Sequence, residues 1–366
     1  MRAVEPTRRS FLKRMTAACG MFWLGPGDPA ALDDSGCRDD FAGRTIRWIV
    51  PQAPGGGYDA YSRLIAPFYA DKLSAEAVVE NIVGAGGSVG ANVLKHARPD
   101  GTTVGLMNAS GIVVASMLGD ANTPSPVTDF AILGRVARTP QIWASGKGSG
   151  LLNMYDVLTV ARRRPLLFGI QDVGSTNFAG ISVGSFLMGL DYEVVAGYPG
   201  TAAAVMAALR GEVDLIGFTF ESVLNWIDAG DLKPVLQLSD APISPQPSLE
   251  GVSLLGGPNG LAERRARELG QDTDQARDDA GALASVLNLG RVVVAPAGLE
   301  PGVFECLEAT LYETLTDPDL EKAAAQANWT LDVARAEVTM NNLRQGAENA
   351  TRFIPLLRRA IRRVQG

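Results

Sequence analysis

Short apolar runs alternate with longer amphipathic segments along most of this chain. Each short run is about four to six residues long and is typical of a strand, whereas the longer segments are typical of helices. Strands are predicted at 45–50, 76–81, 103–107, 131–134, 141–144, 166–170, 193–196, 213–217, 234–238 and 290–295. Helices are predicted at 59–74, 88–97, 153–163, 177–188, 200–210, 220–229, 301–315, 317–327 and 335–363.

This alternation predicts an α/β protein whose sheets are parallel and joined by helical crossovers. With 366 residues, of which 46% are hydrophobic, the chain is long enough for two domains. One stretch, 257–282, breaks the pattern because it is highly charged and shows little apolar periodicity. It is expected to be a solvated excursion or a surface helix.

A glycine-rich loop follows the first predicted strand. The run from Val50 to Asp59 contains three consecutive glycines, Gly55 to Gly57, and leads into a predicted helix. Glycines leave backbone N–H groups unshielded, and these groups lie at the positive end of the helix dipole. Such a loop is suited to hold an anion, most simply a carboxylate, without a charged side chain.

Two further strand–turn–helix junctions have the same organisation. One lies at 171–177, where hydroxyl and amide side chains are added, and the other lies at 195–201. Three such turns in two halves of the chain suit a cleft in which helix N-termini converge on one ligand.

The charge of the chain restricts its partners. The formal net charge is −7, and without residues 1–36 the chain keeps 28 Lys and Arg against 36 Asp and Glu. An acidic surface argues against nucleic acid or anionic lipid as the main partner. It leaves a small anionic ligand possible, because local N–H groups decide binding in a closed cleft.

The N-terminus carries an export signal. Residues 7–13 match the twin-arginine pattern, and an apolar stretch from Met15 to Leu24 follows. That stretch is too short to span a membrane. Residues 1–43 are therefore expected to be a signal peptide with a disordered lead, cleaved somewhere between 27 and 43, and the mature protein is expected to be soluble and periplasmic.

The three cysteines leave several states open. Cys19 follows a poor lipoprotein box, so lipidation there is not favoured. Cys37 and Cys306 would be able to pair in an oxidising compartment. Twin-arginine substrates usually fold before export, where thiols stay reduced, so a buried or incidental Cys306 is favoured over a disulfide.

Several short runs match sequence patterns of enzymes, but their surroundings do not fit those sites. The segment 180–184 matches the pattern of a nucleophile elbow, but it lies within a predicted helix. The one histidine, His96, lies upstream of it, whereas the base of such a site would follow it. The glycine run 84–90 has the wrong spacing for a dinucleotide loop, and 146–149 lacks the upstream glycine of a P-loop. One histidine and scattered cysteines leave no credible zinc site, and His96 is expected at the surface.

Several motifs, in order, resemble the Bug family, the substrate receptors of tripartite tricarboxylate transporters. They begin with the first glycine loop and Arg63, and continue through 79–90, 99–103, 174–175, 198–200, 211–214 and 295–301. The similarity covers roughly 44–230 well and 288–340 moderately.

The resemblance implies a periplasmic binding protein of type II, with two α/β domains and a ligand cleft between them. Domain I would comprise 44–140 and 241–366, and domain II 141–240. The implied function is capture of a small organic carboxylate, by a monomer without cofactor or metal, for delivery to the membrane subunits of a tripartite transporter. The implied ligand-binding residues are Gln52, Ala53, Gly55, Gly56, Gly57, Tyr58, Asp59, Asn108, Gly174, Ser175, Thr176, Phe178 and Tyr198.

Some features depart from the family pattern. The family often has histidine where this chain has Phe178, and Tyr58 adds an aromatic ring on the opposite wall. Both rings favour a ligand with an aromatic or alkyl body, unless they simply pack beneath the loops. Asp59 and Asp172 are also explained as a helix cap and a turn residue.

Three alternatives stay open from the sequence. A receptor of another transporter class, such as a TRAP-associated protein, would clamp the carboxylate with an arginine, for which Arg135 and Arg138 are candidates. A sensor-associated binding protein would look the same in sequence. An enzyme on this scaffold is disfavoured because no catalytic base is evident.

Overall fold

The structure is a computed structural model that describes residues 34–118, 123–125, 127–173, 175–243 and 246–365. The chain separates into Met1–Asp34 and a compact unit, Ser35–Gly366, which contains all of the described strands. The predicted twin-arginine motif, its apolar stretch and Cys19 lie outside the described residues.

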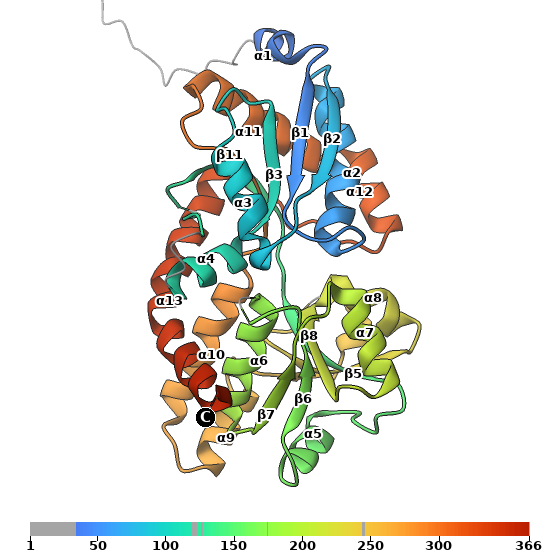
Figure 1. The fold of residues 1–366 in the computed structure, drawn as a ribbon, viewed down its shortest axis with the longest axis vertical. Helices are drawn as coiled ribbons and strands as arrows, with labels where there is room; N and C mark the ends of the chain where they lie inside the picture. Colours follow the sequence, from blue (N-terminus) through green and yellow to red (C-terminus); the bar gives the residue numbers. More distant parts are fainter. Residues whose placement is uncertain (1–33, 119–122, 126, 174, 244–245, 366) are drawn as a thin grey trace, which may run out of the picture. The chain divides into compact units, whose positions relative to one another are not determined.

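Two six-stranded mixed sheets organise the compact unit (Figure 1). In the first sheet, β1, β2 and β3 are parallel, and β11 lies antiparallel between β3 and β4. Its strands, in spatial order, are β12 (Ala334–Arg335), β4 (Phe130–Ala137), β11 (Arg291–Pro296), β3 (Thr103–Asn108), β1 (Thr45–Val50) and β2 (Glu76–Asn81).

The second sheet has the same arrangement in its five longer strands. Here β6, β7 and β8 are parallel, and β5 lies antiparallel between β8 and β9. In spatial order its strands are β10 (Ser253–Leu254), β9 (Leu232–Gln237), β5 (Gln141–Gly146), β8 (Leu215–Thr219), β6 (Leu166–Gly169) and β7 (Tyr192–Val195).

Helices connect the strands and cover both faces of each sheet. They are α1 (Asp34–Phe41), α2 (Gly57–Lys72), α3 (Ser88–Lys95), α4 (Ala109–Leu118), α5 (Met154–Ala161), α6 (Thr176–Met188), α7 (Thr201–Arg210), α8 (Phe220–Asp228), α9 (Leu261–Glu268), α10 (Thr273–Leu287), α11 (Pro301–Leu315), α12 (Pro318–Gln326) and α13 (Ala336–Gln365). Two 3-10 turns, Ala85–Gly87 and Pro247–Leu249, complete the set.

The core follows the alternation of the strands. In β11, Val293 and Ala295 face a cluster with α2 and α11, whereas Val292 and Val294 face a cluster that also contains residues of α4, α6, α10 and α13. Alternate residues of a strand point to opposite faces, so β11 is buried on both sides. The second of these clusters includes side chains from both sheets and joins them into one unit.

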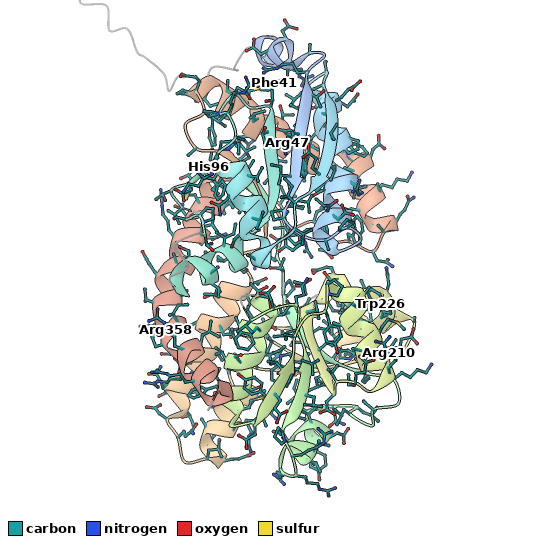
Figure 2. The ribbon with its side chains drawn as sticks, viewed as in Figure 1. Phe41, Arg47, His96, Arg210, Trp226 and Arg358 are labelled. Carbon is teal, nitrogen blue, oxygen red and sulfur yellow. The ribbon has the colours of Figure 1, made fainter. Side chains whose placement is uncertain are left out.

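The predicted strands are confirmed, but the expectation of parallel sheets was wrong in part. β5 and β11 run against their neighbours, and the two-residue strands β10 and β12 were not predicted. An apolar run carries no information on strand direction, because direction depends on the route of the chain between sheets. His96 is exposed at the surface, as expected (Figure 2).

The charged stretch 257–282 forms ordered, packed structure. It contains α9 and most of α10, which lie against α6, and α10 also packs on α13. Leu261, Ala262, Ala266 and Ala280 are buried there. Of the two expectations for this stretch, a helix is confirmed and a solvated excursion was wrong, because alanines supply the buried face while the charged residues between them dominate the composition.

Cys306 is buried in α11 and is disulfide-bonded. The expectation of a merely buried or incidental cysteine was therefore wrong. Folding before export does not prevent oxidation once a protein reaches an oxidising compartment.

Candidate functional site

The six parallel strands lead into helices at their carboxyl ends. In the first sheet β1 leads to α2, β2 to α3 and β3 to α4, and in the second sheet β6 leads to α6, β7 to α7 and β8 to α8. Ligands of open α/β sheets bind at this edge. The predicted glycine loops, 51–56 and 170–175, are the connections after β1 and β6.

The first loop leaves the start of α2 without a side-chain cap. Gly56 is the N-cap residue, and no side chain caps the helix. The first-turn N–H groups of a helix have no intrahelical partner, so those of Gly57 and Tyr58 remain available to a ligand. Gly55 has φ +78°, a conformation that favours glycine.

Asp59 holds this loop in shape. Its carboxylate accepts a hydrogen bond from the Gly55 N–H at 2.9 Å and pairs with Arg63 at 2.9 Å. Burial alone would raise the pKa of Asp59, but the bonds from Arg63 and the Gly55 amide outweigh it, so the pKa lies below its ordinary value. Arg63 also donates to Asn81, which in turn donates to the Gln52 carbonyl at 3.0 Å.

Gln52 and Ala53 are half-buried at the beginning of the loop. A Cβ on Gly87 would lie 3.3 Å from Gln52 Nε2, so the Gln52 side chain contacts the N-cap residue of α3. The glycine run 84–90, whose spacing does not match a dinucleotide-binding loop, therefore adjoins the first loop.

In the second loop, Gly174 lies outside the described residues. Ser175 is the N-cap of α6, where its Oγ accepts from the Phe178 N–H at 3.3 Å and donates to the Asp172 carbonyl at 2.7 Å. The Ser175 hydroxyl is therefore engaged in the cap, and the amide of Thr176, the first helical residue, is the donor closest to the loop.

Asn108 joins the two walls. It ends β3, and its Nδ2 donates to Thr176 Oγ1 at a long 3.4 Å. Its Oδ1 accepts from the Gly111 N–H at 3.1 Å, which caps α4. The structure thus brings together one predicted site residue from each sheet.

The two remaining aromatic candidates are placed differently. Phe178 is 2% exposed and belongs to the hydrophobic core, so its ring packs beneath the loop. Tyr198 is half-buried, lies over Gly169 at the end of β6, and directs its hydroxyl toward Glu212. Burial, followed by the Glu212 charge, raises the pKa of Tyr198.

One feature beside the first loop was not predicted from the sequence. Arg291, the first residue of β11, is fully buried, and its guanidinium lies over the rings of Tyr58 (5.0 Å) and Tyr61 (4.6 Å). Its Nη1 lies 3.7 Å from Glu221 Oε2 on α8. The sequence did contain one indication of it, because Arg291 is the lone arginine at the start of an otherwise apolar strand.

The arginines proposed for a clamp are occupied elsewhere. Arg135 pairs with Asp332 Oδ1 at 2.5 Å, and Arg138 pairs with Asp332 Oδ2 at 3.1 Å. Arg135 also donates to the Asp332 carbonyl. Both therefore bind the segment before β12.

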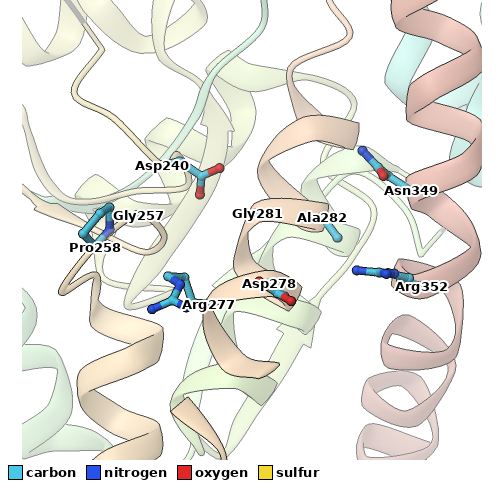
Figure 3. Close-up of a pocket in the computed structure, with 9 residues that line it drawn as sticks. All are labelled: Asp240, Gly257, Pro258, Arg277, Asp278, Gly281, Ala282, Asn349 and Arg352. Carbon is cyan, nitrogen blue, oxygen red and sulfur yellow. The ribbon is translucent and has the colours of Figure 1, made fainter. Parts of the chain in front are cut away.

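A cavity of about 460 Å³ lies away from these loops, between α10, α13 and the segment after β9 (Figure 3). It contains none of the predicted site residues. Its lining residues are Asp240, Gly257, Pro258, Arg277, Asp278, Gly281, Ala282, Asn349 and Arg352. Arg277 is already paired with Asp274 and Glu263.

The described residues offer neither a metal site nor a membrane-spanning helix. No group of three His, Cys, Asp or Glu residues among them is arranged to hold a metal ion. Among the helices of the same residues, none combines the length and apolar character needed to cross a membrane.

Comparison with known proteins decides the family. A family profile described as "Tripartite tricarboxylate transporter family receptor" matches residues 62–260, which is more than half of the chain. The chain belongs to this receptor family. The resemblance to Bug proteins is thereby confirmed, and the family is one of solute-binding receptors and not of enzymes.

Individual relatives are distant. Protein BugT of Bordetella pertussis is 25% identical over 331 residues, covering 90% of this chain and 92% of BugT. A UPF0065 protein from the tcbD-tcbE intergenic region of Pseudomonas sp. strain P51 is 29% identical over 183 residues, which span 49% of this chain and about half, 53%, of that protein.

The fold is shared with solved receptors. The structure of MatC from Rhodopseudomonas palustris with bound malate has a TM-score of 0.66 at 22% identity, covering 86% of this chain and 99% of MatC. The predicted fold class, an α/β protein like the type II periplasmic binding proteins, is confirmed.

Proposed function

We propose that this protein is a periplasmic receptor that captures a small organic carboxylate and delivers it to the membrane subunits of a tripartite transporter. The observation that carries the proposal is the start of α2, where Gly56 provides no side-chain cap and the first-turn amides are left for an anion. The Asn108–Thr176 contact supports a second wall at the start of α6.

The proposed chemistry is recognition without reaction. Amides of the two loops donate to the carboxylate oxygens, and closure of the cleft excludes water and strengthens each bond. Hydrogen bonds to a charged group contribute about 1.5–3 kcal/mol each. Loss of one donor would therefore weaken binding about tenfold or more.

The proposed pathway follows from the sequence and the family. The twin-arginine motif at 7–13 would export the folded protein to the periplasm, where it would act as a monomer without a cofactor. The two sheets support domains close to 44–140 plus 241–366 and 141–240, although β10 at Ser253–Leu254 pairs with the second sheet.

The proposed ligand is a carboxylate that needs no cationic side chain. MatC binds malate, which supports an organic acid as the ligand class here. A receptor with an arginine clamp is less well supported, because Asp332 holds both Arg135 and Arg138.

The ligand can be identified directly. Protein purified without added acids is denatured, and the released small molecules are analysed by mass spectrometry. A thermal-shift screen of mono-, di-, tricarboxylic and aromatic acids then tests binding. We expect one organic acid to be released and to raise the melting temperature, and release of a neutral sugar or a cation would contradict the proposal.

A matched pair of variants tests the second wall. Thr176→Pro removes one loop amide at a helix position that accepts proline, after an extended Ser175 (φ −75°, ψ 154°). Thr273→Pro makes the same change at the start of α10, after Asp272 (φ −67°, ψ 117°), away from the site. We expect calorimetry to show at least tenfold weaker binding of the identified acid for Thr176→Pro, and unchanged binding for Thr273→Pro.

A further inference from the structure

Arg291 occupies an unusual position for a charged side chain. It is 0% exposed, it begins a strand of the first sheet, and its guanidinium reaches the end of the second sheet's β8 and the start of α8. Buried arginines are rare unless they are paired or stacked. The groups around Arg291 must therefore compensate the cost of burying its charge.

The contacts of the guanidinium are numerous but individually weak. Nη1 lies 3.4 Å from the Arg138 carbonyl and 3.7 Å from Glu221 Oε2, and Nη2 lies 3.5 Å from Thr219 Oγ1. Within the described part of the chain, Arg291 Nε has no hydrogen-bond partner. These polar contacts are too long to account for its placement on their own.

The guanidinium also packs against the start of α2. The Tyr58 and Tyr61 rings both lie within the distance at which a cation is attracted to an aromatic face. A Cβ on Gly57 would fall 3.0 Å from Arg291 Nη2 and 2.9 Å from Ser222 Oγ. The last glycine of the first loop is therefore packed between β11 and the start of α8.

We propose that Arg291 is a positioning residue for the carboxylate site, fixing the start of α2 and its glycine loop against the 219–222 segment of the second sheet. This inference rests on the proposed function of the first loop. Arg291 does not contact the ligand, because it has no exposed surface. It acts through Tyr58, Tyr61 and the backbone of Gly57.

Glu221 has a separate part in this arrangement. It lies in the first turn of α8, and its side chain is 8% exposed. It balances the charge of Arg291 across the 3.7 Å ion pair, and desolvation by burial raises its pKa despite the nearby guanidinium. Removing Glu221 therefore disturbs charge balance, whereas removing Arg291 also removes the support of the loop.

The test compares variants that separate these two effects. Arg291→Met removes stacking and charge, and Arg291→Met with Glu221→Gln removes the charge of both partners. Arg291→Lys keeps the charge but not the planar group. Arg135→Met is the matched control, because Arg135 is also a buried arginine, lies on the neighbouring strand β4 and binds Asp332 instead of the loop.

Hydrogen exchange of ligand-free protein is the primary measurement, and calorimetry with malate, the acid bound by MatC, as the probe is the second. We expect the hydrogen-bonded amides within 53–60, which are those of Gly55, Gly56 and Ala60, to exchange at least tenfold faster in Arg291→Met, and to an intermediate extent in Arg291→Lys. The double variant should melt closer to wild type than Arg291→Met but keep the fast exchange. Arg135→Met should leave 53–60 unchanged.

Three results would overturn the inference: wild-type protection of 53–60 in Arg291→Met, equal loosening in Arg135→Met, or full recovery of protection in the double variant. The exchange data decide this independently of any ligand. If wild type binds no organic acid while the exchange pattern is as expected, the proposed function fails and the positioning role stands.

Discussion

At the scale of single residues, the three consecutive glycines have different constraints. Gly55 has a positive φ, and a Cβ on Gly57 would lie within about 3 Å of Arg291 Nη2 and Ser222 Oγ. Gly56 has φ −83°, and a Cβ on it would meet no atom closer than 3.5 Å. The sequence indicated the loop and its chemistry, because a glycine run before a helix is a local signal. It did not indicate which glycine is sterically required, because the neighbours of Gly57 come from segments far away along the chain.

Substitution of Gly57 tests that close approach. Gly57→Ala places a methyl group against Ser222 Oγ and Arg291 Nη2, so we expect a loss of about 1–3 kcal/mol in the free energy of unfolding. Gly302→Ala, in the first turn of α11, meets open space and should stabilise by about 0.5–1 kcal/mol. Urea denaturation measures both, and equal effects would argue against the contact.

Asp59 predicts a pH dependence. Because its folded-state pKa is lowered, its carboxylate stabilises the protein above its ordinary pKa of about 4, and this contribution is lost as the pH falls through the folded-state value. Asp59→Asn should therefore cost about 1–3 kcal/mol at pH 7 and progressively less below pH 4.

The control for Asp59 is Asp156 of α5, which accepts from the amide four residues before it, Leu152, at 2.9 Å but lies away from the site. Asp156→Asn should leave ligand affinity unchanged, whereas Asp59→Asn should weaken it. A constant cost of Asp59→Asn between pH 7 and pH 3 would show that the titration is assigned to the wrong group.

At Asn108, a negative charge can be introduced with almost no change in side-chain shape, which tests whether a carboxylate binds nearby. Asn108→Asp keeps an oxygen to accept from the Gly111 N–H but places a negative charge beside Thr176. We expect carboxylate affinity to fall at least tenfold at pH 7, with little change in melting temperature. Unchanged affinity in calorimetry would place the carboxylate away from Asn108.

At the scale of elements, α10 shows that a highly charged composition can hide a buried helix. Its sequence holds three Asp residues and one Arg among small residues, yet Ala276, Ala280 and Leu283 form a buried face against neighbouring helices. The spacing of alanines carried the helical period, but alanine is a weak hydrophobic signal beside so many charges. Strand runs were easier to predict, because Val and Ile occupy both faces of buried strands.

The packing of α10 predicts a strong effect at one position. Leu283 is 0% exposed, so Leu283→Ala should lower the free energy of unfolding by about 2–5 kcal/mol. Asp278→Ala, at an exposed position of the same helix, should change it by less than about 0.5 kcal/mol. Similar small effects in chemical denaturation would mean that α10 is a dispensable surface helix.

At the scale of the whole described unit, the five longer strands of each sheet have the same pattern, with one antiparallel strand inserted beside three parallel ones. The edge strands differ, because β12 is antiparallel to β4 and β10 is parallel to β9. The loops after β1 and β6 are equivalent in this pattern, which is why two similar sequence motifs fall on opposite walls of the proposed site. Both loops could be located from the sequence. The Arg291–Glu221 pair could not, because partners far apart in the chain and on different sheets leave no local pattern.

A crystal structure of the protein with the acid that it retains on purification tests the central claim most directly. The account predicts that the carboxylate oxygens lie about 3 Å from backbone N–H groups of 57–58 and 176–177, with no arginine or lysine side chain in contact. A carboxylate held by a bidentate arginine, or bound in the cavity beside Arg277 and Arg352, would contradict it.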